Sequence, residues 1–163
     1  VATRLEYLFI RGNPALFDCS FDEDRFSRFD NGWLKHMRGI QWNAALMKAT
    51  KLPQALSEAK QLRLLHVYFS QIVEIPVWFT NFQYLQNLRI LLGQIQSVPV
   101  VLTKLPKLNH LDLDGNPVCY QTDADFRAHG IEPLHYEYFS CGVSYEGGTQ
   151  NGSENMIQND VLC

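Results

Sequence analysis

Short stretches of alternating apolar and polar residues return along this chain every 23 residues. Within each stretch, apolar side chains occupy every second position, which predicts a strand with one buried face. Shifting the sequence by 23 positions aligns three rows of apolar residues, Leu62/Leu85/Leu108, Leu65/Leu88/Leu111 and Val67/Ile90/Leu113. A weaker copy begins at Gly39, and Leu5, Leu8, Ile10 and Asn13 fit the same template. The chain therefore predicts a row of repeated strands.

Prolines and turn residues recur at the same interval. Pro53, Pro76 and Pro99 each follow an apolar residue, which argues against an amphipathic helical domain because proline breaks helix interiors. The turn after each strand carries Ser70, Gly93 or Asn116. An Asn side chain bonds to nearby backbone groups, and Ser can do part of this. Glycine has no side chain, so we expect a looser turn at Gly93.

The sequence Gly-Asn-Pro occurs twice, at 12–14 and at 115–117, each time after a predicted strand. We interpret it as turn chemistry rather than as two copies of a binding site. The first copy precedes extra residues, because Leu5 lies 34 positions before Gly39, which is 11 more than one repeat. Within that excess, Phe26, Phe29 and Trp33 share one face of a predicted helix. We expect this insertion to pack on the repeats; a partner-binding projection is the alternative.

The repeated pattern resembles the 23-residue class of the leucine-rich-repeat family, L-x-x-L-x-L-x-x-N-x-L-x-x-I-P-x-x-L-x-x-L-x-x, over about residues 39–119. The resemblance implies an α/β fold, a right-handed solenoid shaped like a horseshoe. Short parallel strands would line its concave face, and helical or irregular segments its convex side. The expected divisions are an N-terminal strand and turn (1–20), a helical insertion (21–38), the repeat array (39–118), a C-terminal cap (119–141) and a flexible tail (142–163).

The end of the array is similar to the cap of many extracellular members of this family. Asn116-Pro117-Val118-Cys119 is a variant of their N-P-x-x-C element, although the usual C-x-C pair is absent. The resemblance implies a Cys119–Cys141 disulfide and an extracellular location or the ectodomain of a membrane protein. Two free thiols in a cytoplasmic protein are the alternative, and the partners of Cys19 and Cys163 stay open. Thr122 or Asp123 is expected to begin a short helix that Gly130 ends.

Composition and the absence of known motifs argue against several classes of function. A net charge of −3 and a pI near 5.9 argue against a nucleic-acid partner, and no apolar run is long enough to span a membrane. Nucleophile-elbow, phosphate-loop and C-x-x-C motifs are absent from the sequence. We therefore expect no enzyme, cofactor or metal site. Because the chain starts at Val1 without an initiator Met and ends at Cys163, we expect it to be part of a longer polypeptide.

The polar positions of the strands are the candidate ligand-binding surface, because the resemblance places them on the concave face. Aromatic residues and arginine are typical anchors of protein interfaces, and the acidic C-terminal end favours a basic or mixed-charge protein or peptide. We expect alanine at Tyr68 and Arg89 to weaken binding without changing stability. The candidates are Tyr7, Phe9, Arg11, Asn43, His66, Tyr68, Asn87, Arg89, His110, Asp112 and Asp114.

Other functions are weaker alternatives. The chain is alternatively the recognition or regulatory arm of a larger receptor or enzyme, or it binds a carbohydrate or lipid surface through Tyr7, Phe9 and Tyr68. The ligand could also bind elsewhere and leave this face to solvent. His110, Asp112 and Asp114 alternate on one strand and could converge on a metal or act as an acid–base pair. We disfavour that reading because no ligand cluster on the neighbouring repeat completes such a site.

Overall fold

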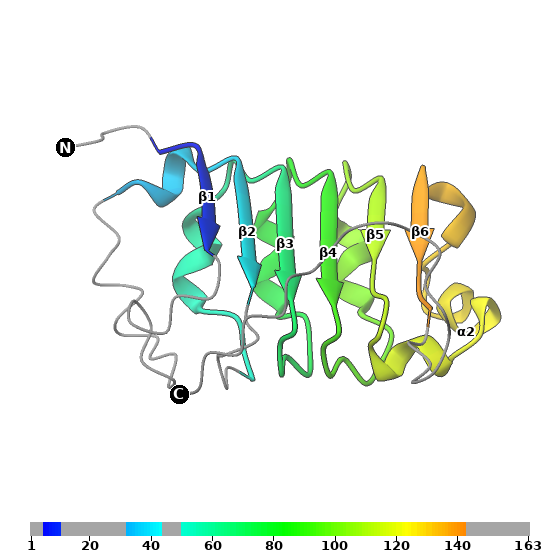
Figure 1. Cartoon of the computed structure of the whole chain (residues 1–163). Helices are drawn as coiled ribbons and strands as arrows, with labels where there is room; N and C mark the ends of the chain where they lie inside the picture. Colours follow the sequence, from blue (N-terminus) through cyan, green and yellow to red (C-terminus); the bar gives the residue numbers. More distant parts are fainter. Residues whose placement is uncertain (1–4, 11–31, 44–49, 143–163) are drawn as a thin grey trace, which may run out of the picture.

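A single all-parallel sheet of six strands organises the protein. The computed structural model describes residues 5–10, 32–43 and 50–142. The strands lie side by side in the order of the sequence (Figure 1): β1 (Tyr7–Ile10), β2 (Gly39–Asn43), β3 (Leu64–Tyr68), β4 (Asn87–Leu91), β5 (His110–Asp112) and β6 (Tyr138–Ser140). The repeated pattern predicted the first five, which are confirmed. It did not predict β6.

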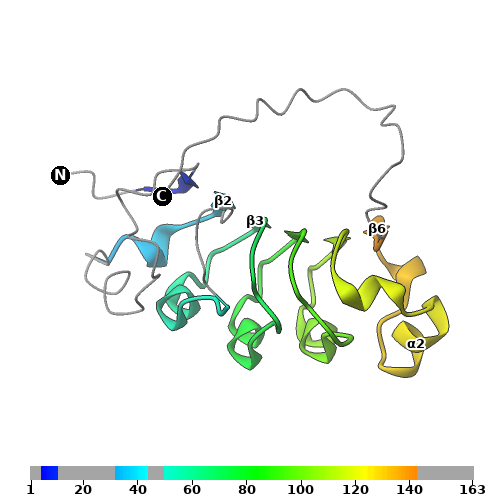
Figure 2. The ribbon, with the colours of Figure 1, turned by 60° about the horizontal axis from the view of Figure 1, so that its bottom comes forward.

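The connections between strands run along the opposite side of the molecule through short 3-10 helices (Figure 2). Three of them are η2 (Gln54–Glu58), η3 (Val77–Asn81) and η4 (Val100–Lys104). Each begins directly after one of the regularly spaced prolines, whose fixed φ suits the N-cap position and whose missing N–H is not needed there. The i→i+3 bonds that define this geometry include Leu56 N to Pro53 O (3.0 Å) and Phe79 N to Pro76 O (3.0 Å).

Apolar side chains at repeated positions fill the space between the sheet and these turns. Leu65, Leu88 and Leu111 are 0% exposed in neighbouring strands, so the inward face predicted from alternation is confirmed. On the turn side, the rings of Phe79 and Phe82 lie 5.0 Å apart between centroids. Because each copy buries its apolar residues against the next, no copy completes a core by itself.

The turns after the strands repeat one backbone conformation. Phe69 (φ 54°), Leu92 (φ 52°) and Gly115 (φ 72°) lie 23 residues apart and all have positive φ, a region that glycine adopts at least cost. Each donates its N–H to a carbonyl at or just after the end of the following strand, Leu91 O (3.0 Å), Asp114 O (2.9 Å) and Gly142 O (2.7 Å), respectively. The last acceptor belongs to the cap, so the cap extends the backbone hydrogen-bonding pattern of the repeats by one further step.

Asn116 connects two neighbouring turns. Its amide group donates to Ile90 O (2.6 Å) and Leu113 O (2.8 Å), and its oxygen accepts from Ile95 N (3.1 Å), with the residue 1% exposed. Gly93 leaves room for this carboxamide, because a Cβ there would lie 2.6 Å from Asn116 Oδ1. Asn116 therefore contributes hydrogen bonds to the turn that contains Gly93, and the looser turn expected there stays a prediction.

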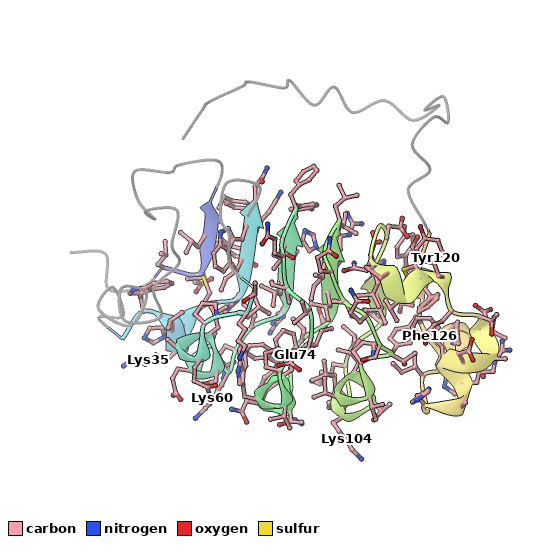
Figure 3. The ribbon with its side chains drawn as sticks, turned by 90° about the horizontal axis from the view of Figure 1, so that it is seen from below. Lys35, Lys60, Glu74, Lys104, Tyr120 and Phe126 are labelled. Atoms are coloured by element: carbon pink, nitrogen blue, oxygen red, sulfur yellow. A yellow bond between two sulfur atoms is a disulfide. The ribbon has the colours of Figure 1, made fainter. Side chains whose placement is uncertain are left out.

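The cap begins with the expected helix. Thr122 is the N-cap of α2 (Asp123–Ala128) and forms a reciprocal capping box with Asp125, which satisfies backbone donors at the helix start. Gly130 follows the helix with φ 80°, as predicted for its stop. Phe126 points into the interior of the cap (Figure 3) and is 1% exposed.

Cys119 and Cys141 bracket the cap with their sulfur atoms at disulfide-bonding distance and their Cα atoms 4.9 Å apart. The predicted pairing is therefore present in the structure. It ties the 3-10 helix η5 (Pro117–Tyr120) to the residue that follows β6, so the first and last parts of the cap are held together.

Several sequence predictions fall on residues outside the described ranges. They include Arg11, Cys19, the aromatic residues Phe26 and Phe29 of the insertion, and the tail with Cys163. Trp33, the third aromatic of the insertion, precedes η1 (Leu34–His36) and packs against the core. Across the described ranges, no helix has the length and apolar character needed to cross a membrane.

Candidate binding surface on the parallel sheet

The residues at the alternate positions of each strand that do not face the core form rows across the sheet, because the strands pair in register. The central row runs through Phe9, Gln41, His66, Arg89, Asp112 and Ser140. A second row contains Tyr7, Gly39, Leu64, Asn87, His110 and Tyr138. Neighbouring members of a row are about 4.8 Å apart, the spacing of paired strands. Seven of the eleven predicted site residues thus lie in two adjacent rows; Asn43 pairs with Tyr68 in a third.

Two aromatic residues lie exposed at the β1 end of this surface. Phe9 is 65% exposed and Tyr7 is 53% exposed. The Tyr7 ring lies over Gly39, since a Cβ on that glycine would come within 2.6 Å of Tyr7 Cδ1. The glycine therefore provides the space that lets this ring lie against the strand, and Phe9 is the more available apolar contact.

His66, Tyr68 and Asn87 form a hydrogen-bonded group in the middle of the sheet. His66 Nε2 lies 2.9 Å from Asn87 Oδ1, and the Tyr68 hydroxyl lies 3.3 Å from His66 Nδ1. A neutral imidazole satisfies both contacts by donating from Nε2 and accepting at Nδ1. Burial lowers the pKa of His66 below 6.5; the Asn87 hydrogen bond opposes this and the Arg89 charge adds to it. His66 is therefore neutral at neutral pH.

The lowered pKa of His66 predicts that the folded state loses stability in mild acid. The unfolded chain binds a proton on His66 first as the pH falls, because its pKa is near 6.5. The free energy of unfolding should therefore decrease below about pH 6.5 and level off below the folded-state pKa. Urea unfolding across this range should show a smaller decrease for His66→Gln. An equal decrease in both proteins would contradict the assignment.

Arg89 and Asp112 form an ion pair next to this group. Arg89 Nε lies 3.8 Å from Asp112 Oδ2, and Asp112 is 6% exposed. Burial raises the pKa of Asp112, and the Arg89 charge opposes that shift. Removing Arg89 alone would leave a buried carboxyl group without its partner. The structure therefore argues against the expectation that alanine at Arg89 leaves stability unchanged.

The acidic end predicted from Asp112 and Asp114 is satisfied inside the protein. Asp112 Oδ1 accepts from Asp114 N (3.2 Å), and Asp114 Oδ1 accepts from Ser140 Oγ (2.6 Å) and from Gly142 N. The Asp114 carboxyl group thus connects the segment after β5 to Ser140 of the cap strand β6, whereas the Asp112 carboxyl group is engaged by Asp114 N and Arg89. This removes the main basis for expecting a basic partner.

His110 lies between β4 and the cap. Its ring stacks on Tyr138 with 5.7 Å between centroids and 14° between planes, and its Nδ1 lies 3.9 Å from Glu137 Oε2. The described residues contain no group of three or more His, Cys, Asp or Glu side chains that could hold a metal ion.

Sequence reasoning missed the contribution of the cap to this surface. Tyr138 and Ser140 continue the two rows, although neither was a candidate. The run of residues 136–140 is rich in aromatic residues, which favour strands, but it lacks a period-two pattern, because both Tyr136 and Phe139 pack against the core. The strand β6 also starts further from β5 than the 23-residue repeat predicts, so the repeat did not indicate it.

Comparison with known proteins adds no assignment. No protein-family description matches the chain, and no curated protein matches it.

Proposed function

We propose that this chain is a leucine-rich-repeat solenoid and that it recognises a protein or peptide through the face of the sheet that carries Phe9, His66 and Arg89. It acts as a non-catalytic interaction module. Support comes from the 23-residue pattern together with in-register parallel strands that alternate with turns after regularly spaced prolines.

The observation that carries the proposal is one continuous row, with an exposed aromatic residue at one end and an arginine near its centre. Phe9 is 65% exposed, and the Arg89 side chain is 36% exposed. Hydrogen bonds between strands hold the backbone of this row in place, so binding requires little ordering of the chain. Aromatic and arginine side chains are the residues most often responsible for interface affinity.

A selection of peptides from a random displayed library tests the proposal. Peptides enriched on the wild-type chain should bind Phe9→Ser at least about tenfold more weakly, the size of effect expected for an interface anchor. The matched control is Val77→Ser, which replaces an apolar residue that is 77% exposed on the turn side, beside a groove lined by Trp78 and Val100. Loss of binding only in Val77→Ser would place the ligand there and overturn the proposal.

The same proposal includes location and context. An extracellular or ectodomain setting is supported by the Cys119–Cys141 pair, since disulfides persist in oxidising compartments. A cytoplasmic protein with two free thiols is the competing view. The recognition arm of a larger receptor or enzyme is compatible with the same surface.

A further inference from the structure

Four hydrogen-bond acceptor atoms on this face are already engaged by neighbouring side chains and backbone groups. His66 Nδ1 is engaged by Tyr68, and Asn87 Oδ1 is engaged by His66. Asp112 Oδ1 accepts a backbone N–H, and Asp114 Oδ1 accepts two donors from the cap. A ligand on this face therefore finds few of these acceptor atoms unengaged.

Donors remain on the same two strands. Among the described residues, neither Asn87 Nδ2 nor the terminal guanidinium nitrogens of Arg89 have a hydrogen-bond partner. Arg89 Nε is buried, so a ligand would meet the terminal nitrogens of this 36% exposed side chain. The one ion pair of Arg89, at 3.8 Å, is too long for a hydrogen bond. A guanidinium group carries five N–H donors. The neighbouring His66 is neutral, so Arg89 is the positive charge at the centre of the row. Arg89 and Asn87 thus present donors, next to acceptors that are already engaged.

A carboxylate supplies what this arrangement lacks. It offers two acceptor oxygens, and its hydrogen bonds to a guanidinium are among the stronger ones in proteins. Asp112 is also a carboxylate, but it is 6% exposed and contacts the buried Nε of Arg89, so it does not occupy the exposed part of the guanidinium. Its ion pair with Arg89 helps to hold that side chain in place, so it acts as a positioning residue.

The exposed Phe9 fixes the spacing of a second contact. Phe9, Gln41, His66 and Arg89 lie in one row on four successive strands. Three strand spacings span about 14 Å, and an extended peptide advances about 3.4 Å per residue. A peptide lying across the strands would therefore cover this distance with about four residues.

We propose that the partner of this surface is an extended peptide segment that places a carboxylate on Arg89 and Asn87 and an apolar side chain, about four residues away, on Phe9. This inference rests on the proposed function and reverses the expectation of a basic partner.

Two matched synthetic peptides test the inference, one taken from the library selection with its acidic residue and one with that residue changed to its amide. The acidic peptide should bind about tenfold more tightly. The difference should disappear in the double variant Arg89→Gln/Asp112→Asn, which removes both charges of the ion pair, and persist in Arg63→Gln, which removes an exposed positive charge outside the row. NMR shift mapping on labelled protein should place the acidic peptide at Asn87 and Phe9.

Each outcome decides between the two proposals. If both peptides bind equally and still shift the signals of Phe9 and its row, the recognition surface stands and the carboxylate inference is overturned. If the selected peptides carry no acidic residue, the result is the same. If the shifts lie on the turn side, or if the library yields no binder, the proposed function itself fails.

Discussion

Replacing Asn116 with alanine should lower the free energy of unfolding by about 3–4 kcal/mol. The carboxamide makes three hydrogen bonds inside the protein, to Ile90 O, Leu113 O and Ile95 N, and the residue is 1% exposed. Each lost bond leaves a polar backbone group with fewer partners in a dry interior, at a cost of about 1–3 kcal/mol for a group left unsatisfied. Urea unfolding followed by circular dichroism measures the change.

Asn81→Ala is the matched control, because Asn81 is an exposed asparagine in η3. It should change stability by less than about 0.5 kcal/mol, as is usual for surface substitutions. A similar loss of stability in both variants would show that the hydrogen bonds of Asn116 between turns do not stabilise the protein more than an exposed asparagine does.

The sheet could be predicted from the sequence because strand burial is a local, repeated signal. Leu65 and Val67 occupy the inward positions of β3, and residues 23 positions later do so in β4. Each prediction needed only the period-two alternation and the spacing of the copies. The prolines that begin the 3-10 helices followed from the same spacing, since a fixed φ has the same effect in every copy.

The properties of the candidate site depended on contacts between copies, which one-dimensional patterns do not contain. Asp112 and Arg89 both looked exposed by position, but their pairing across β4 and β5 buries the carboxyl group. The turn that contains Gly93 receives hydrogen bonds from a side chain that lies 23 residues further along the chain. The acidic end was likewise satisfied by Ser140, in a strand that the repeat did not predict, and by Gly142, which follows that strand.

These contacts also link the cap to the proposed binding surface. Asp112 forms the ion pair with Arg89 of β4 on one side and pairs with Ser140 of the cap strand β6 on the other. The cap therefore supports the side chains beside the central row as well as covering the end of the core. Changes that loosen β6 should affect the acidic residues before they reach the aromatic end at β1.

Loss of the Cys119–Cys141 pair should destabilise the chain by about 3 kcal/mol, the amount expected when a loop with a sequence separation of 22 loses its cross-link. The change to test is Cys119→Ala/Cys141→Ala, compared with the oxidised wild type by urea unfolding. Reduced wild-type protein is the control, because it loses the bond and keeps the sulfur atoms. A non-reduced digest analysed by mass spectrometry should contain the linked peptides.

The loss should be concentrated at the cap end of the sheet. Leu113 N donates to Ser140 O (2.9 Å), and Gly115 N donates to Gly142 O (2.7 Å). Hydrogen exchange at these two amides should therefore accelerate more than at Leu65, which lies in β3. Unlinked thiols in the digest of protein from an oxidising compartment would contradict the disulfide. Equal acceleration along the whole sheet would contradict its role as a local tie of β6, because such a tie acts first on the strand it holds.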